Sequence, residues 1–128
     1  MPLEIKMQRP AGDEGAGAVT VRLTGSLDTA TAPELERQLA ATLTGPVKNI
    51  VFDLASLKFL TSAGIRVFST TRKTLQESGG QTSFVNMQPQ IEVVFEVIKA
   101  LPGISVFKDM AELDRYLALL QRSHPGSR

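Results

Sequence analysis

The chain has 128 residues, enough for one domain that buries roughly two-thirds of its unfolded surface. Its net charge of +1 and its lack of tryptophan argue against a nucleic-acid binder that relies on a basic field or on aromatic stacking. The absence of cysteine excludes disulfides, thiolate metal sites and cysteine nucleophiles, and the one histidine, His124, excludes a site built from several histidines.

The first half of the chain predicts two strands and a helix. Leu3–Met7 is expected to form a short strand, and Val19–Thr24 alternates apolar and polar residues as a half-exposed strand does. A loop without a helix joins the two, so they are expected to pair antiparallel. A helix then begins at Thr31–Glu34, which matches a capping box with proline in the first turn, and ends at Gly45-Pro46.

The second half predicts three further strands, each followed by a helix. The expected elements are strands at Ile50–Leu54, Thr82–Asn86 and Ser105–Phe107, and helices from Ser62 to Ser78, from Pro89 to Leu101 and from Asp109 to Leu120. In the helix from Pro89 to Leu101, the side chains expected to face the core are Val93, Val94, Val97, Ile98 and Leu101, with Phe95 on the outer side. In the helix from Asp109 to Leu120, they are Met110, Leu113, Leu117 and Leu120.

This alternation predicts a single α/β domain over residues 1–120 and a flexible C-terminal tail over residues 121–128. We expect a mixed, mostly parallel sheet of about five strands with about four helices. Because the carboxyl ends of parallel strands meet at one edge of a sheet, Gly25–Thr31, Asp53–Gly64 and Asn86–Gln90 are expected to converge there.

Thr61–Gly64 holds the main candidate site. Four small residues follow a buried strand at the start of a helix, where a hydroxyl can cap the helix and stay open to a partner. Ser62 is therefore expected to be a regulated position, and Gly64 to allow a close approach by a partner. The residues expected to meet the same partner are Ser26 and Asp28, together with Asn86 or Gln88.

Three stretches of the chain resemble one family. They are GSLDTATAPELERQL, NIVFDLASLKFLTSAGIRVF and GGQTSFVNMQPQIEVVFEVIKALPGI, and in order and spacing they are similar to the STAS domain. The resemblance runs from about Val19 to Leu120, and its most specific part is the strand–DLxxLxFLTSAG–helix unit. The family includes the anti-sigma-factor antagonists and the cytoplasmic tails of sulfate transporters.

The resemblance implies an antagonist that acts by partner switching. In the antagonists the serine that matches Ser62 is phosphorylated by an anti-sigma factor that is also a serine protein kinase of the GHKL type. The unphosphorylated antagonist binds this kinase and frees the sigma factor, and a PP2C-type phosphatase resets the switch. The implied protein is a phosphoprotein that regulates transcription without catalysis, cofactor or metal. Its expected partner-binding residues are Ser26, Leu27, Asp28, Thr61, Ala63 and Gly64.

Two positions differ from the antagonists. The residue before the acceptor is commonly Asp in that family but is Thr61 here, and the residue after it, often Ser, is Ala63. Thr61 is thereby a candidate second phosphoacceptor. Structural roles are the alternatives: Ser62 or Thr61 as a helix cap, and Asp28 in an Asx turn.

Other functions remain open at this point. STAS-like chains also occur in stress-sensing assemblies and as accessory subunits of lipid-transporting ABC complexes, and a third candidate is a module that binds a nucleotide or an anion. Enzymatic roles have little support, because no histidine or pocket-forming aromatic accompanies Asp28 and Asp53, and His124 lies in the tail. With no apolar run near ~18 residues and no secretory signal, we expect a cytoplasmic protein without membrane insertion.

Overall fold

The computed structural model describes residues 2–8, 18–45, 47–96, 99 and 104–123. The elements in chain order are β1 (Leu3–Gln8), β2 (Ala18–Leu27), α1 (Ala32–Leu43), β3 (Asn49–Leu60), α2 (Ser62–Glu77), β4 (Gln81–Val85), α3 (Pro89–Phe95), β5 (Ile104–Phe107) and α4 (Met110–Ser123). Every predicted strand and helix is present in this order. The expected tail beyond α4, residues 124–128, lies outside the described part.

The strands form one sheet in the order β1-β2-β3-β4-β5. β1 pairs antiparallel with β2, and every other neighbouring pair is parallel. Parallel neighbours need a crossover that returns the chain to the amino end of the next strand, and α1, α2 and α3 lie on these crossovers. The predicted mixed, mostly parallel α/β sheet is confirmed.

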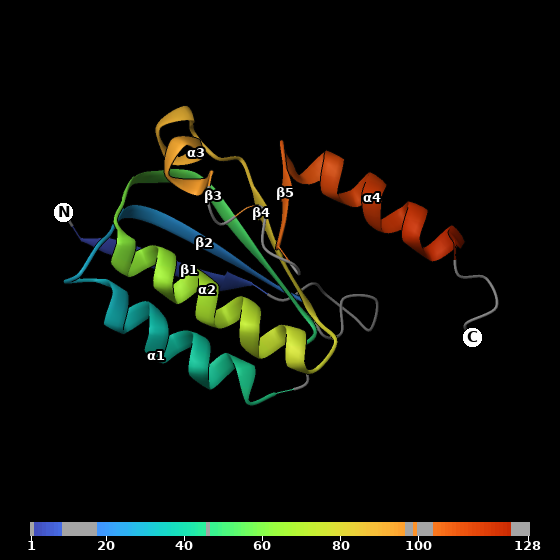
Figure 1. Cartoon of the computed structure of the whole chain (residues 1–128), viewed down its shortest axis with the longest axis horizontal. Helices are drawn as coiled ribbons and strands as arrows, with labels where there is room; N and C mark the ends of the chain where they lie inside the picture. Colours follow the sequence, from blue (N-terminus) through green and yellow to red (C-terminus); the bar gives the residue numbers. More distant parts are fainter. Residues whose placement is uncertain (1, 9–17, 46, 97–98, 100–103, 124–128) are drawn as a thin grey trace.

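The helices lie on both faces of the sheet. Alternate residues of β3 separate the two layers: Ile50 and Phe52 belong to the main core beneath α1, α2 and α3, whereas Val51 packs with Val85 and with Leu113 of α4. Figure 1 shows α1 and α2 side by side across one face, while α4 follows β5 and extends away from the sheet. β3 is therefore covered on both faces along its first half.

Four phenylalanines fix α2 and α3 over the centre of the sheet. Phe52 of β3, Phe68 of α2, Phe84 of β4 and Phe95 of α3 are fully buried. The ring centroids of the contacting pairs are 4.6 to 5.7 Å apart, within the range in which aromatic pairs attract beyond simple burial.

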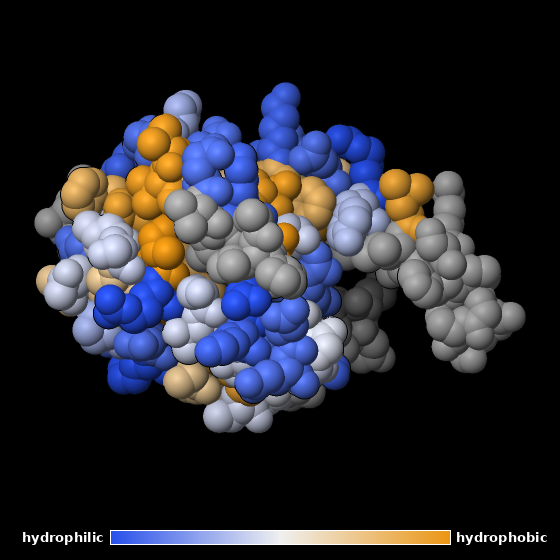
Figure 2. Space-filling model, viewed as in Figure 1, coloured by the Kyte–Doolittle hydropathy of each residue, from blue (hydrophilic) through white to orange (hydrophobic). Residues whose placement is uncertain are grey.

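The predicted inner face of α3 is wrong. Ile91 and Phe95 are buried, whereas Val93 is 73% exposed and Val94 is also exposed. Residues four apart share one face of a helix, so the Phe95 ring, once it is seated in the aromatic cluster, turns Val93 outward. Figure 2 shows apolar side chains at the surface over α3 and toward the start of α2. Val97, Ile98 and Leu101 lie outside the described residues.

The prediction for α4 is correct at one position and wrong at another. Leu113 is buried, but Met110 is exposed. Met110 is the first residue of α4, and the cap ahead of it is present, since Asp109 Oδ1 accepts from the Glu112 amide at 2.9 Å. The side chains of Leu117 and Leu120 are not described.

The predicted capping box at α1 is also wrong. Thr31 is the N-cap, but its hydroxyl points back and donates to Ser26 O at 2.9 Å. The Glu34 carboxylate accepts from the Arg37 guanidinium and from the Gln38 amide instead. These two hydrogen bonds, the one from Arg37 first, lower the pKa of Glu34. The carboxylate that would complete the box is thus engaged one turn further along the helix.

Candidate functional site

β3 continues well past its predicted end. The segment between Asp53 and Ser62, expected to be a junction, is strand as far as Leu60. Between the paired positions Arg22–Asp53 and Leu27–Leu60, β3 has two more residues than β2, and the register shifts twice. Each shift is a β-bulge on β3. Figure 1 shows the strand passing α3 before the chain turns into α2.

Thr61, rather than Ser62, is the N-cap of α2. Its amide donates to Leu27 O at 3.1 Å, and its carbonyl accepts from the amides of Gly64 and Ile65 at 3.0 and 3.1 Å. The Thr61 side chain makes no cap hydrogen bond, and its hydroxyl is 3.5 Å from Leu27 O. The backbone of Thr61 therefore joins the end of β2 to the start of α2.

Ser62 is exposed at the first position of α2, above a tightly packed base. Gly64 is buried, and a Cβ there would lie 2.5 Å from Leu60 Cδ1 and 2.6 Å from Leu27 Cγ. Contacts this short exclude any side chain at position 64 unless the neighbours move. The glycine thus serves close packing of the helix on the strand ends, and this packing holds Ser62 in place.

The turn after β2 is held by side-chain hydrogen bonds and lies next to Thr61. Asp28 Oδ1 accepts from the amides of Ala30 and Thr31 at 3.0 and 3.1 Å, as in an Asx turn. Ser26 and Leu27 are buried, so a partner at this turn would meet their backbone rather than their side chains. Asp28 and Ala63 are half-buried.

Asn86 and Gln88 are placed away from Ser62. Asp53 is buried, and its Oδ1 accepts from the Ala55 amide at 3.1 Å and from Asn86 Nδ2 at 3.0 Å. Gln88 Nε2 donates to Ala55 O. Leu60 lies seven positions beyond Asp53 along the strand, a distance of about 20 Å. The carboxyl ends of β3 and β4 therefore do not converge, and the polar groups after β4 hold the middle of β3.

Arg22 completes the Asp53 network. Its Nε lies 3.3 Å from Asp53 Oδ2, and the two residues are register partners in β2 and β3. The arginine side chain is 51% exposed, whereas the carboxylate is nearly covered. With hydrogen bonds from two strands and from the turn after β4, Asp53 acts as a structural link between β2, β3 and that turn.

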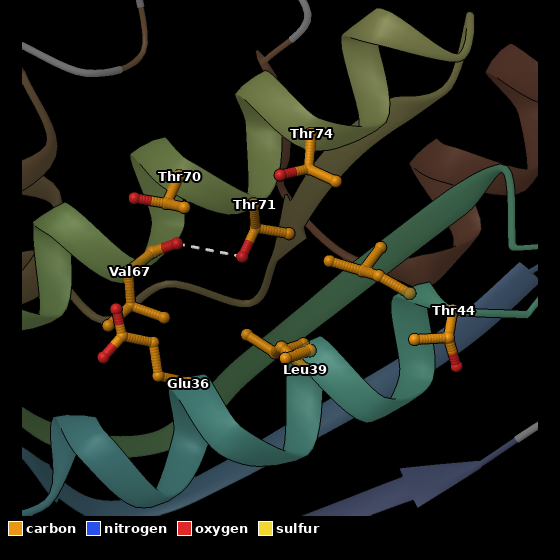
Figure 3. A pocket seen from close by; sticks show the side chains of 9 residues that line it. Glu36, Leu39, Thr44, Val67, Thr70, Thr71 and Thr74 are labelled. Atoms are coloured by element: carbon orange, nitrogen blue, oxygen red, sulfur yellow. Dashed lines mark hydrogen bonds between the residues drawn. The ribbon is translucent and has the colours of Figure 1, made fainter.

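A groove of about 460 Å³ lies between α1 and α2 (Figure 3). Its walls are formed by Glu36, Leu39, Ala40, Leu43, Thr44, Val67, Thr70, Thr71 and Thr74. The Thr71 hydroxyl donates to Val67 O at 2.9 Å within its own helix. Figure 3 shows Glu36 at one end of the groove and Thr44 at the other. Its lining is aliphatic and threonine-rich with a single carboxylate, and it does not include Ser62.

The described residues hold neither a metal-binding cluster nor a membrane-spanning helix. Among them, no three His, Cys, Asp or Glu side chains gather where they could hold a metal ion. No helix within the same ranges is both long enough and apolar enough to cross a membrane.

Sequence reasoning missed two exposed residues that precede Ser62. Lys58 is exposed, and Phe59 is 56% exposed. A signal for them exists in LASLKFL, where Leu54, Leu57 and Leu60 are three apart. A strand with period two cannot direct all three leucines to the same core, so bulges between them could have been inferred.

Comparisons with known proteins agree with this architecture. The family model of the STAS domain matches residues 9–113. BtrV of Bordetella bronchiseptica, named as a candidate anti-sigma factor antagonist, is 32% identical over 85 residues, which cover 66% of this chain and 73% of BtrV. The structure of the anti-sigma factor antagonist SpoIIAA in its unphosphorylated form has a TM-score of 0.73 at 20% identity and covers 90% of this chain and 97% of SpoIIAA. Phosphorylated Bacillus SpoIIAA has a TM-score of 0.68 at 20% identity over 88% and 99% of the two chains. By its sequence match, this chain belongs to the STAS domain family.

Proposed function

We propose that this protein is an anti-sigma factor antagonist of a bacterial partner-switching pathway, and that phosphorylation of Ser62 is its switch. The observation that carries the proposal is the exposed Ser62 hydroxyl at the start of α2, on a base formed by Leu27, Leu60 and Gly64. The names of BtrV and SpoIIAA, and the existence of SpoIIAA in a phosphorylated form, support the role.

A phosphate at Ser62 suits the start of α2. The first amides of a helix have no partner within it, and the helix dipole favours negative charge there by about 0.3–1 kcal/mol. The base beneath Ser62 is buried, so the added charge stays at the surface and the fold is kept. Against a complementary partner surface the same dianion costs ~1–3 kcal/mol, which weakens binding about 5–150-fold.

The partner in this proposal is an anti-sigma factor that is also a GHKL-type serine kinase. It binds the unphosphorylated protein in the cytoplasm, and a PP2C-type phosphatase restores that form. The protein itself carries out no catalysis. Asp28, Thr61, Ala63 and the backbone of Ser26, Leu27 and Gly64 surround the acceptor, and Thr61 is the candidate second acceptor.

Phosphate mapping tests the proposal. The purified protein is incubated with its cognate anti-sigma factor and ATP, and the phosphate is located by mass spectrometry. We expect label at Ser62 in the wild-type chain and its loss in Ser62→Ala, with Thr61→Ala as the matched control that retains label. A wild-type chain that carries no label at either Ser62 or Thr61 rules out the phosphorylation switch.

A further inference from the structure

A β-bulge turns Phe59 out of the core. Leu57 and Leu60 are buried, while Lys58 and Phe59 between them are both exposed. Gly25 pairs with Leu57 and Ser26 with Phe59, so Lys58 is the inserted residue. If this sequence formed a regular strand with no bulge, alternation from the buried Leu57 would point Phe59 inward. One extra residue thus places an aromatic ring in solvent, 56% exposed.

The exposed ring lies at an end of the sheet that also carries a hollow. Phe59 shares a face with its register partner Ser26, and the Ser26 amide donates to Pro2 O at 3.4 Å. A hollow of about 340 Å³ adjoins this end of β1 and β2. It is lined by Pro2, Leu3, Glu4, Thr24 and Gly25.

The charges that flank the acceptor in the chain are positive. Lys58 precedes Ser62 by four residues and Arg66 follows it by four, and both are exposed. Residues four apart on a helix are neighbours, so Arg66 lies one turn from Ser62. The carboxylate of the adjoining turn, Asp28, accepts hydrogen bonds on Oδ1 from the amides of Ala30 and Thr31 in its own turn.

We propose that Phe59 is the anchor by which this protein docks into an apolar pocket of its anti-sigma factor, with Lys58 facing a carboxylate at the rim of that pocket. This contact rests on the proposed function and adds to it the chemistry of the partner surface. Ser62 lies three positions after Phe59, which is at most about 11 Å along the chain. An interface of about 800 Å² on each partner covers both.

The composition of the surface supports an acidic protein partner. Aromatic and arginine side chains are enriched in protein interfaces, and a few central side chains carry most of the binding energy. A partner carboxylate complements Lys58 and Arg66 while Ser62 is unmodified. A phosphate on Ser62 repels the same carboxylate, so phosphorylation weakens binding at the surface that attracts the partner.

Calorimetric titration of the purified cognate anti-sigma factor tests this contact. Phe59→Ala should weaken binding about 30-fold or more, as expected for an interface hot spot. Val93→Ala removes another exposed apolar side chain, from α3, and should bind within about twofold of wild type. Lys58→Glu, which changes no buried group, should weaken binding about tenfold, with the loss diminishing at high salt. Circular dichroism verifies that each variant is folded.

A Ser62→Asp variant in the same series separates the two proposals. If wild type binds, Ser62→Asp loses affinity, and Phe59→Ala and Lys58→Glu bind like wild type, the Phe59 anchor is wrong and the proposed function stands. If wild type does not bind the anti-sigma factor, the proposed function fails, and the anchor fails with it. A loss in Phe59→Ala and Lys58→Glu, with Val93→Ala unchanged, supports the anchor.

Discussion

Thr31 and Thr61 both occupy N-cap positions, but their hydroxyls differ in what they contact. Thr31 Oγ1 donates to Ser26 O and accepts from the Asp28 amide, both at 2.9 Å. Thr61 Oγ1 has one long contact of 3.5 Å, to Leu27 O, and the backbone of Thr61 makes the cap. A sequence pattern identifies both threonines as caps, yet it cannot tell which hydroxyl is bonded, because this depends on the preceding turn.

This difference predicts unequal costs of truncation. Thr31→Ala should lower the free energy of unfolding by about 1–2 kcal/mol, since it removes hydrogen bonds at a half-buried turn. Thr61→Ala should lower it by less than about 0.5 kcal/mol. Urea unfolding of both variants checks the order, and equal costs would show that the Thr61 hydroxyl contributes as much as that of Thr31.

Asp53 and Arg22 should also contribute unequally. Asp53→Ala should lower the free energy of unfolding by about 2–3 kcal/mol, because it leaves the Ala55 amide and Asn86 Nδ2 without their acceptor. Arg22→Ala should cost less than about 1 kcal/mol, since the half-exposed guanidinium returns to water. Denaturant unfolding measures both, and a larger cost for Arg22 would contradict the structural role assigned to Asp53.

At the scale of elements, α3 shows that the spacing of apolar residues does not always predict which face of a helix is buried. Its valines suggest a core face, but the Phe95 ring fits between Phe68 and Phe84 and determines how the helix is rotated. That fit depends on residues from other elements, so the sequence of α3 alone does not contain it.

The orientation of α3 can be tested by two truncations. Phe95→Ala should lower the free energy of unfolding by about 3–5 kcal/mol through the cavity that it leaves. Val93→Ala should change it by less than about 0.5 kcal/mol, because the side chain is in solvent. Thermal or urea unfolding of the two variants gives the comparison, and a larger loss for Val93→Ala would mean that α3 is rotated as its valines suggest.

The packing of α2 on the strand ends should make Gly64 sensitive to a single methyl group. Gly64→Ala should lower the free energy of unfolding by about 1–3 kcal/mol, because the new Cβ would overlap Leu60 and Leu27. Gly45→Ala is the control, since its Cβ would be 3.7 Å from the nearest atom, Thr42 O. Urea unfolding of both variants applies here, and an unchanged Gly64→Ala protein would mean that the start of α2 is loosely packed.

The length of β3 is the largest difference between the expected and the observed elements. Ile50–Leu54 was recognisable as a buried strand, but the continuation to Leu60 contains leucines three apart and does not alternate. Pairing with β2 and two bulges make it strand. Local sequence therefore predicted the existence of every described element, whereas the end of β3 required its neighbour.

At the scale of the whole molecule, unequal strand lengths divide the expected site. The general rule that places sites at the carboxyl edge of parallel strands correctly predicts that the end of β2 lies next to the start of α2. The hydrogen bond from the Thr61 amide to Leu27 O joins the two. It fails for the turn after β4, because β4 ends beside Asp53 while β3 runs on to Leu60. Asn86 and Gln88 consequently stabilise the sheet. Of the three expected junctions, only the GSLD turn after β2 adjoins the start of α2 and Ser62.

That Ser62 and the residues around it form a partner-binding site remains a prediction. The exposure of Ser62 and the packing beneath it are properties of the fold, and the sequence indicated both through the small residues of Thr61–Gly64. The Phe59 and Lys58 surface was not predicted, although the spacing of the leucines in LASLKFL carries a signal for it, because it arises from a β-bulge where β3 pairs with β2.

The most direct measurement compares the affinity of the cognate anti-sigma factor for the unmodified protein and for the protein phosphorylated at Ser62. Titration calorimetry supplies the affinities, and urea unfolding of the two forms supplies their stabilities. We expect binding that is about 5–150-fold weaker after phosphorylation, and an unfolding midpoint that is the same or slightly higher, because the start of α2 favours the added negative charge. Equal affinities, or a loss of affinity that accompanies unfolding of the modified chain, would contradict this expectation.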